Sequence, residues 1–149
     1  MSAEQLARNR ADFWGEIVRR PLDDAWHRER SADWSKVTTP FLSLGNWDSL
    51  EEHLRGNLEG FTQAASEQKW LDVHAGNHLE GVLGDYYTRL QMRFFDHFLK
   101  GEDNGWEREP RVHLHVRPID GRQTDRYEHE WPLARTDWTP FYLDRPLGG

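Results

Sequence analysis

The sequence contains no cysteine, which excludes disulfide bonds and thiolate metal sites. It has no apolar run of membrane-spanning length, and the polar stretch from Met1 to Arg10 lacks the apolar centre of a signal peptide. No cluster of lysine or arginine offsets the formal net charge of −7, which disfavours phosphate backbones and anionic lipids. We therefore expect a cytoplasmic protein that binds neither nucleic acid nor membranes.

The sequence also lacks Gly-x-Ser-x-Gly, the motif that places a nucleophilic serine on a tight turn between a strand and a helix. Ser43 comes nearest, because Gly45 follows it by two positions, but Phe41 precedes it by two and the segment resembles a strand. With no cysteine to replace serine, this chain contains no recognisable catalytic nucleophile.

The sequence contains enough apolar residues to form the core of one compact domain or of parts of two. It has 149 residues, of which 36% are hydrophobic, and its eight tryptophans are mostly expected to fill cores or line apolar pockets. Ser2 and Gln5 form a capping-box pattern that predicts an amphipathic helix over residues 3–18. Residues 21–39 are charged and interrupted, and we expect a loop that can include a helical turn.

Residues 40–100 alternate between strand and helix patterns. Residues 40–45 and 69–74 are short apolar runs that suit buried strands of a parallel sheet. Apolar residues recur at helical spacing over residues 50–65 and again over 83–100, where Gly101 can close the second helix. This order of elements is typical of an open α/β sheet.

The pattern changes after a turn-rich connector at residues 101–110. Residues 112–116 and 127–131 alternate apolar and polar side chains, and residues 141–143 form a third short apolar run. We therefore predict antiparallel β structure over residues 110–143 and a domain boundary in the connector.

Asp48 and His78 each follow a predicted strand, where the carboxyl ends of parallel strands open a crevice that often holds functional side chains. If the two strands are neighbours, the carboxylate of Asp48 could orient the imidazole of His78, which would then serve as a general base. Asp48 could instead cap the helix that follows, and His78 could be a surface histidine.

Three histidine or acidic patterns partly resemble metal sites, but none has the full pattern of one. His74 and His78 are four residues apart, but the residues between them are not typical of a helix. His113 and His115 point the same way from one predicted strand, yet no third ligand is evident, which favours a solvated or interdomain face. Residues 103–105 resemble a tight turn more than a calcium loop. We expect no metal and no cofactor.

The segments WLDVHAGNH, FFDHFLKGEDNGW, EPRVHLHVR and EWPLA resemble the family of cocaine esterase and X-prolyl dipeptidyl peptidases. The resemblance is most specific over residues 94–106 and extends weakly from about residue 23 to residue 143. It implies an α/β-hydrolase domain, a helical cap and a C-terminal β jelly roll, with Asp48 of GNWD and His78 of HAGNH as triad acid and base. The family's serine lies upstream of the matching region.

The resemblance implies three parts: the end of a cap region (1–39), the C-terminal part of an α/β-hydrolase domain (40–105) and the first strands of a jelly roll (106–149). We expect a fragment of a serine hydrolase acting on small-molecule esters or peptide amides, inactive alone. The alternative is a non-catalytic interaction or ligand-binding module with exposed sheet edges. Apolar residues such as Val112, Leu114 and Val116 are expected to lack full cover, which favours self-association or a missing complementary chain.

Overall fold

The computed structural model describes residues 2–49, 53–77, 79, 83–120 and 122–143. The chain divides into two compact units, Met1–Asp33 and Trp34–Gly149. Within the described residues, no helix combines the length and the apolar character needed to cross a bilayer. The assignment of residues 1–39, 40–105 and 106–149 to cap, hydrolase and jelly-roll parts stays a prediction.

The first unit contains three short helices, α1 (Ala3–Arg8), α2 (Phe13–Arg19) and α3 (Ala25–Arg28). The predicted single helix over residues 3–18 is wrong, because α1 ends at Arg8 and α2 starts anew after Asp12. The carboxylate of Asp12 accepts a hydrogen bond from the backbone N–H of Gly15, which is a helix-start geometry. The predicted capping box of Ser2 and Gln5 is present.

The second unit is built on a mixed four-stranded sheet in the order β1 (Phe41–Asn46), β2 (Lys69–His74), β3 (Val112–Val116) and β4 (Thr124–Glu128). The strands β1 and β2 are parallel neighbours from Phe41↔Lys69 to Asn46↔His74, as predicted. The strand β3 also runs parallel to β2, whereas the sequence predicted only antiparallel pairing there.

The parallel pairing of β3 has a topological cause. The chain leaves β2 and crosses over through a long helix, and such a crossover returns the next strand in the same direction. The strand β4 then pairs antiparallel with β3, which confirms that part of the prediction. Residues 141–143 form no strand.

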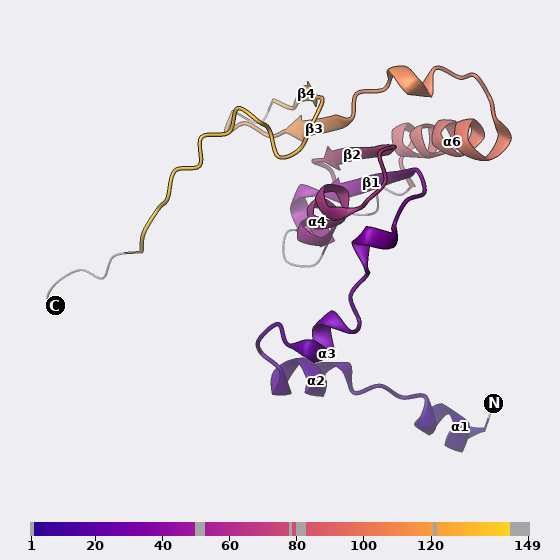
Figure 1. The fold of residues 1–149 in the computed structure, drawn as a ribbon, viewed down its shortest axis with the longest axis vertical. Coiled ribbons are helices and arrows are strands. Elements are labelled where there is room, and N and C mark those ends of the chain that lie inside the picture. Colours follow the sequence, from indigo (N-terminus) through magenta and orange to yellow (C-terminus); the bar gives the residue numbers. More distant parts are fainter. Residues whose placement is uncertain (1, 50–52, 78, 80–82, 121, 144–149) are drawn as a thin grey trace, which may run out of the picture. The chain divides into compact units, whose positions relative to one another are not determined.

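Two helices, α4 (Arg55–Gln63) and α6 (Asp85–Lys100), cover opposite faces of the sheet (Figure 1). Because side chains alternate along a strand, β2 presents Leu71 and Val73 to α4 but Trp70 to α6. The α4 side of the core contains Leu54, Phe61, Leu71, Val73, Val112 and Leu114. The α6 side contains Trp70, Tyr87, Leu90, Phe94 and Trp106.

The expectation that Val112, Leu114 and Val116 lack cover is wrong. Val112 is 0% exposed and Leu114 is 5% exposed, because the α4 side of the core packs on this face of β3. Val116 is partly buried against the same cluster. Trp131, from the segment after β4, adds further cover.

The helix α6 ends as predicted at Lys100, where Gly101 takes the left-handed conformation with φ of 73°. In the connector, the side chain of Asn104 accepts a hydrogen bond from the backbone N–H of Trp106 and donates one to the carbonyl of Arg93. These bonds fix a tight turn, as predicted, and place Trp106 in the core.

Candidate functional site

The carboxyl ends of β1, β2 and β3 lie at one edge of the sheet, because all three strands are parallel. Asp48 lies there in a short 3-10 turn, Trp47–Ser49, directly after β1. Its backbone N–H donates a 2.6 Å hydrogen bond to the side-chain oxygen of Asn46, the last residue of β1. The turn therefore holds the carboxylate at the strand end, where the sequence predicted it.

The side chain of Asp48 pairs with Arg117, which follows β3. Arg117 Nη1 lies 2.5 Å from Asp48 Oδ1 and also donates a 3.2 Å hydrogen bond to the carbonyl of Ala75. One guanidinium thus ties the acid to the loop that follows β2. The alternative role of Asp48, as a cap of the helix that follows, stays a prediction, because residues 50–52 lie outside the described residues.

The predicted base, His78, lies outside the described residues, so its distance from Asp48 stays a prediction. The start of its loop is positioned, because Asn46 donates a 2.7 Å hydrogen bond to the carbonyl of Gly76. His74, at the end of β2, is buried between the Asn46 amide, 3.1 Å from its Nδ1, and the ring of Tyr87.

A second cluster, which the sequence did not predict, lies on the α6 face of the sheet. Asp72 in β2 is directly opposite His113 in β3, and Asp72 Oδ2 lies 2.9 Å from His113 Nδ1. His115 projects from the same face of β3, with its Nε2 3.7 Å from Asp72 Oδ1. Tyr86, at the start of α6, places its hydroxyl 3.2 Å from His113 Nδ1.

The charges in this cluster stabilise one another. Burial alone would raise the pKa of Asp72, but the hydrogen bond from His113 and the nearby imidazole of His115 outweigh burial and lower it. Burial would likewise lower the pKa of His113, whereas Asp72 and Asp125 raise it. Burial and the Asp72 carboxylate raise the pKa of Tyr86, so its hydroxyl keeps its proton.

These contacts correct one part of the expected surroundings of the two histidines. His113 is buried and His115 is partly buried, so neither lies on a fully solvated face. Their partners Asp72 and Tyr86 belong to the predicted hydrolase part, so the expected face between the two predicted parts stays a prediction. Asp72, His113 and His115 have donor atoms that all lie within 4.8 Å of one another, and they are the residues here that could hold a metal ion.

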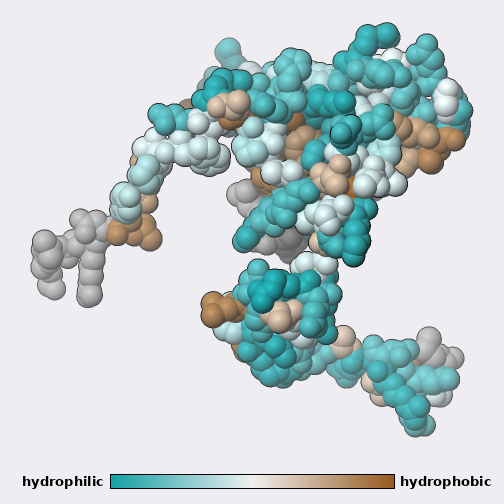
Figure 2. Space-filling view, viewed as in Figure 1, coloured by the Kyte–Doolittle hydropathy of each residue, from teal (hydrophilic) through white to brown (hydrophobic). Residues whose placement is uncertain are grey.

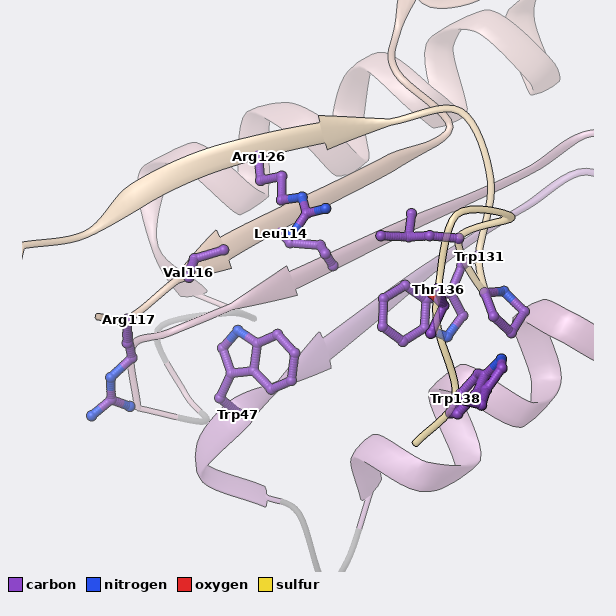
Figure 3. A pocket seen from close by; sticks show the side chains of 10 residues that line it. Trp47, Leu114, Val116, Arg117, Arg126, Trp131, Thr136 and Trp138 are labelled. Atoms are coloured by element: carbon purple, nitrogen blue, oxygen red, sulfur yellow. The ribbon is translucent and has the colours of Figure 1, made fainter. Parts of the chain in front are cut away.

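An open, mostly apolar pocket of about 580 Å³ lies on the α4 side of the sheet (Figure 3). Trp47, Leu114 and Val116 line it from the sheet, while Trp131 and Trp138 line it from the segment after β4 (Figure 3). Trp47 is fixed by a 2.9 Å hydrogen bond from its Nε1 to the carbonyl of His115. Arg117 also lines the pocket, which therefore adjoins the Asp48 ion pair.

A comparison with known sequences and a comparison with known structures point to the same group of hydrolases. No family model matches the sequence. The chain is 43% identical over 56 residues to cocaine esterase from Rhodococcus sp. (strain MB1 Bresler), a match that covers 38% of this chain and 9% of that enzyme.

Two crystal structures of a CocE/NonD family hydrolase from Staphylococcus aureus match this fold with a TM-score of 0.81 and 34% sequence identity. The match covers 90% of this chain and 24% of the hydrolase chain. The chain therefore spans about a quarter of the length of these solved relatives.

Proposed function

This chain belongs to the CocE/NonD family of hydrolases, and we propose that it contributes the acid and the base, but not the serine, of a serine-hydrolase triad. Asp48 is the proposed acid and His78 the proposed base. The serine would come from sequence outside these 149 residues, because no segment here has the nucleophile motif.

The observation that carries this proposal is the double contact of Arg117. It pairs with Asp48 and binds the carbonyl of Ala75, three residues before His78. A carboxylate at the end of β1 is thereby linked to the loop of the proposed base. Two residues with complementary roles on neighbouring parallel strand ends are what a triad requires.

The proposed chemistry is acyl transfer from a small-molecule ester or a peptide amide, including X-Pro amides. His78 would take the proton of the serine hydroxyl as the serine oxygen attacks the carbonyl carbon, and would return a proton to the departing alcohol or amine. Water would then release the acyl group by the same route. Asp48 would hold the imidazole in the required tautomer and stabilise its protonated form.

We further propose that residues 106–149 begin a C-terminal jelly-roll domain. The antiparallel pairing of β3 with β4 supports this assignment. The parallel pairing of β3 with β2 places the first of these strands within the α/β sheet, so the change of architecture would begin at β4.

The isolated chain provides the first test. Purified protein should not turn over a chromogenic ester above the rate of a His78→Ala variant, and a fluorophosphonate probe should not label it. The His129→Ala variant is a matched control, because His129 is an exposed histidine just after β4. Stoichiometric labelling of a serine in this chain would contradict the proposal.

A second test supplies the missing part. If an adjacent upstream reading frame encodes Gly-x-Ser-x-x-Gly, its product should be co-expressed with this chain and assayed for ester hydrolysis. Activity that requires both chains, and that falls by orders of magnitude in Asp48→Asn and His78→Ala, would support the proposal. An active pair that tolerates both substitutions would contradict the assigned roles.

The pocket of Figure 3 favours one alternative, a module that binds an apolar ligand without catalysis. Three tryptophans line this pocket, so an apolar ligand should change their fluorescence. Binding that is lost in Trp131→Ala, and that no co-expressed chain converts into turnover, would favour the module over the hydrolase.

A further inference from the structure

The Asp72 cluster on the α6 face has the donor types and the geometry of a transition-metal site. Asp72 lies opposite His113 across the β2–β3 pairing, and His115 is two residues further along the same face of β3. All three donor atoms lie within 4.8 Å of one another. Ligands of a tetrahedral zinc ion lie about 3.3–3.6 Å apart. Asp72 Oδ2 lies 2.9 Å from His113 Nδ1 and Asp72 Oδ1 lies 3.7 Å from His115 Nε2, so small shifts of these side chains would reach that spacing.

The two imidazoles are oriented as metal ligands usually are. His113 directs Nδ1 and His115 directs Nε2 toward Asp72. The hydroxyls of Tyr86 and Tyr87 also reach these two nitrogens, at 3.2 Å and 3.3 Å respectively. The opposite nitrogen of each ring contacts the same outer carboxylate oxygen, Asp125 Oδ1 in β4, at 3.2 Å from His113 Nε2 and 2.9 Å from His115 Nδ1. A metal-binding histidine typically donates its second N–H to a carboxylate in this manner, which fixes its tautomer.

Asp72 itself provides an independent sign of a missing partner. Its side chain is only 3% exposed, and its Oδ1 makes no hydrogen bond to the part of the chain that the structure describes. A buried carboxylate oxygen without a partner is costly, and the 3.7 Å gap to His115 Nε2 is too long for a hydrogen bond. A cation bound to Oδ1 and to both imidazoles would satisfy it.

We propose that Asp72, His113 and His115 bind one divalent transition-metal ion, most suitably Zn²⁺, with Asp125 as the outer carboxylate that orients both histidines. Two imidazoles and one carboxylate suit zinc and its neighbours better than Mg²⁺ or Ca²⁺, which prefer oxygen ligands. Tyr86 borders this cluster, with its hydroxyl 3.4 Å from Asp72 Oδ2. The ion would link β2 to β3 and, through Asp125, to β4. This proposal does not depend on the proposed hydrolase function.

The test uses the tag-free chain, stripped with a chelator, in equilibrium dialysis against ZnCl₂ with the bound metal measured by elemental analysis. One zinc ion per chain is expected. His113→Gln and His115→Gln should each weaken binding by at least about tenfold, and Asp125→Asn by about 10- to 100-fold. His129→Gln is the matched control and should bind zinc as the wild type does.

X-ray absorption of the zinc-loaded wild type keeps the test decisive even where a variant folds poorly. The spectrum should show two imidazole nitrogens at about 2.0–2.1 Å. Substoichiometric zinc, an absorption spectrum without imidazole scattering, or unchanged zinc binding by the folded His113→Gln/His115→Gln variant would each overturn the proposal.

Discussion

Arg117 connects the segments that follow β1, β2 and β3, at the edge of the sheet where Asp48 lies. It follows β3, pairs with Asp48 after β1 and binds the carbonyl of Ala75 after β2. The two side chains of the ion pair are about half exposed, at 50% and 49%, so solvent screens their attraction. Its contribution is therefore to position the acid more than to stabilise the fold.

We expect Arg117→Ala to lower the free energy of unfolding by less than about 1 kcal/mol, as is usual for exposed ion pairs. The loss should shrink as salt is raised, because added ions screen the pair. Urea melts at low and high salt measure both effects. Arg117→Lys keeps the positive charge but lacks the planar guanidinium that donates hydrogen bonds to two acceptors at once. The carbonyl of Ala75 should therefore lose its hydrogen bond.

Hydrogen exchange at the amides of residues 75–77 provides the local measurement for the same change. Both Arg117 variants should speed exchange in this loop, while Arg122→Ala, in an exposed loop, should not. Unaltered exchange in Arg117→Ala would show that the guanidinium does not hold the loop.

Asp72 shows why part of the site could not be predicted from the sequence. The alternating pattern predicts that His113 and His115 share one face of a strand, but their third partner lies 41 residues before His113 and becomes adjacent only through the β2–β3 register. The sequence does contain one sign of this site, because Asp72 is a carboxylate within an apolar strand, and a buried carboxylate needs a polar partner. Asp48 was predictable because its position depends only on where β1 ends.

At the scale of elements, the sequence patterns correctly predict those helices and strands whose ends depend only on neighbouring residues. The strand β2 spans Lys69–His74 as predicted, and α6 ends at the predicted glycine. The prediction of one helix over residues 3–18 is wrong because the side chain of Asp12 caps a second helix. Such a side-chain hydrogen bond to the backbone competes with a continuous helix, and the spacing of apolar residues does not reveal it. The parallel direction of β3 followed from a crossover, which an alternating pattern does not encode.

Gly101 and Gly56 offer a matched pair that separates two effects of glycine. Gly101 closes α6 with φ of 73°, whereas Gly56 lies within α4, and an added Cβ would meet nothing within 4 Å at either position. Gly101→Ala should destabilise the protein by about 1–2 kcal/mol, because only the backbone conformation opposes it. Gly56→Ala should stabilise it by about 0.5 kcal/mol through helix propensity.

Thermal or urea unfolding of both variants measures this difference in sign. Gly101→Asn serves as a control, because asparagine tolerates the left-handed conformation better than alanine and should lose less stability. If Gly101→Ala were neutral, the left-handed end of α6 would not be required in solution.

At the scale of the whole molecule, an uncovered apolar surface lies on α6, where the sequence did not predict one. Met92, Phe95 and Leu99 recur along one side of α6 and are 57%, 50% and 76% exposed. Figure 2 shows hydrophobic side chains grouped over this helix. Phe95 also lines a hollow between α6 and β1, which is an edge strand of the sheet. An apolar helix face beside an open strand edge favours association with another chain.

We therefore predict that the chain, purified alone, self-associates through this α6 surface. The double variant Phe95→Glu/Leu99→Lys should shift it toward monomer, because charges replace apolar contacts while the new pair at i, i+4 supports the helix. Sedimentation velocity over a range of concentrations measures the change. The same substitutions at Phe141 and Leu143, which are 91% and 106% exposed, alter charge equally but lie outside α6 and should leave the oligomers intact. A wild type that stays monomeric at every concentration, or equal dissociation by both variants, would remove the α6 surface as the site of association.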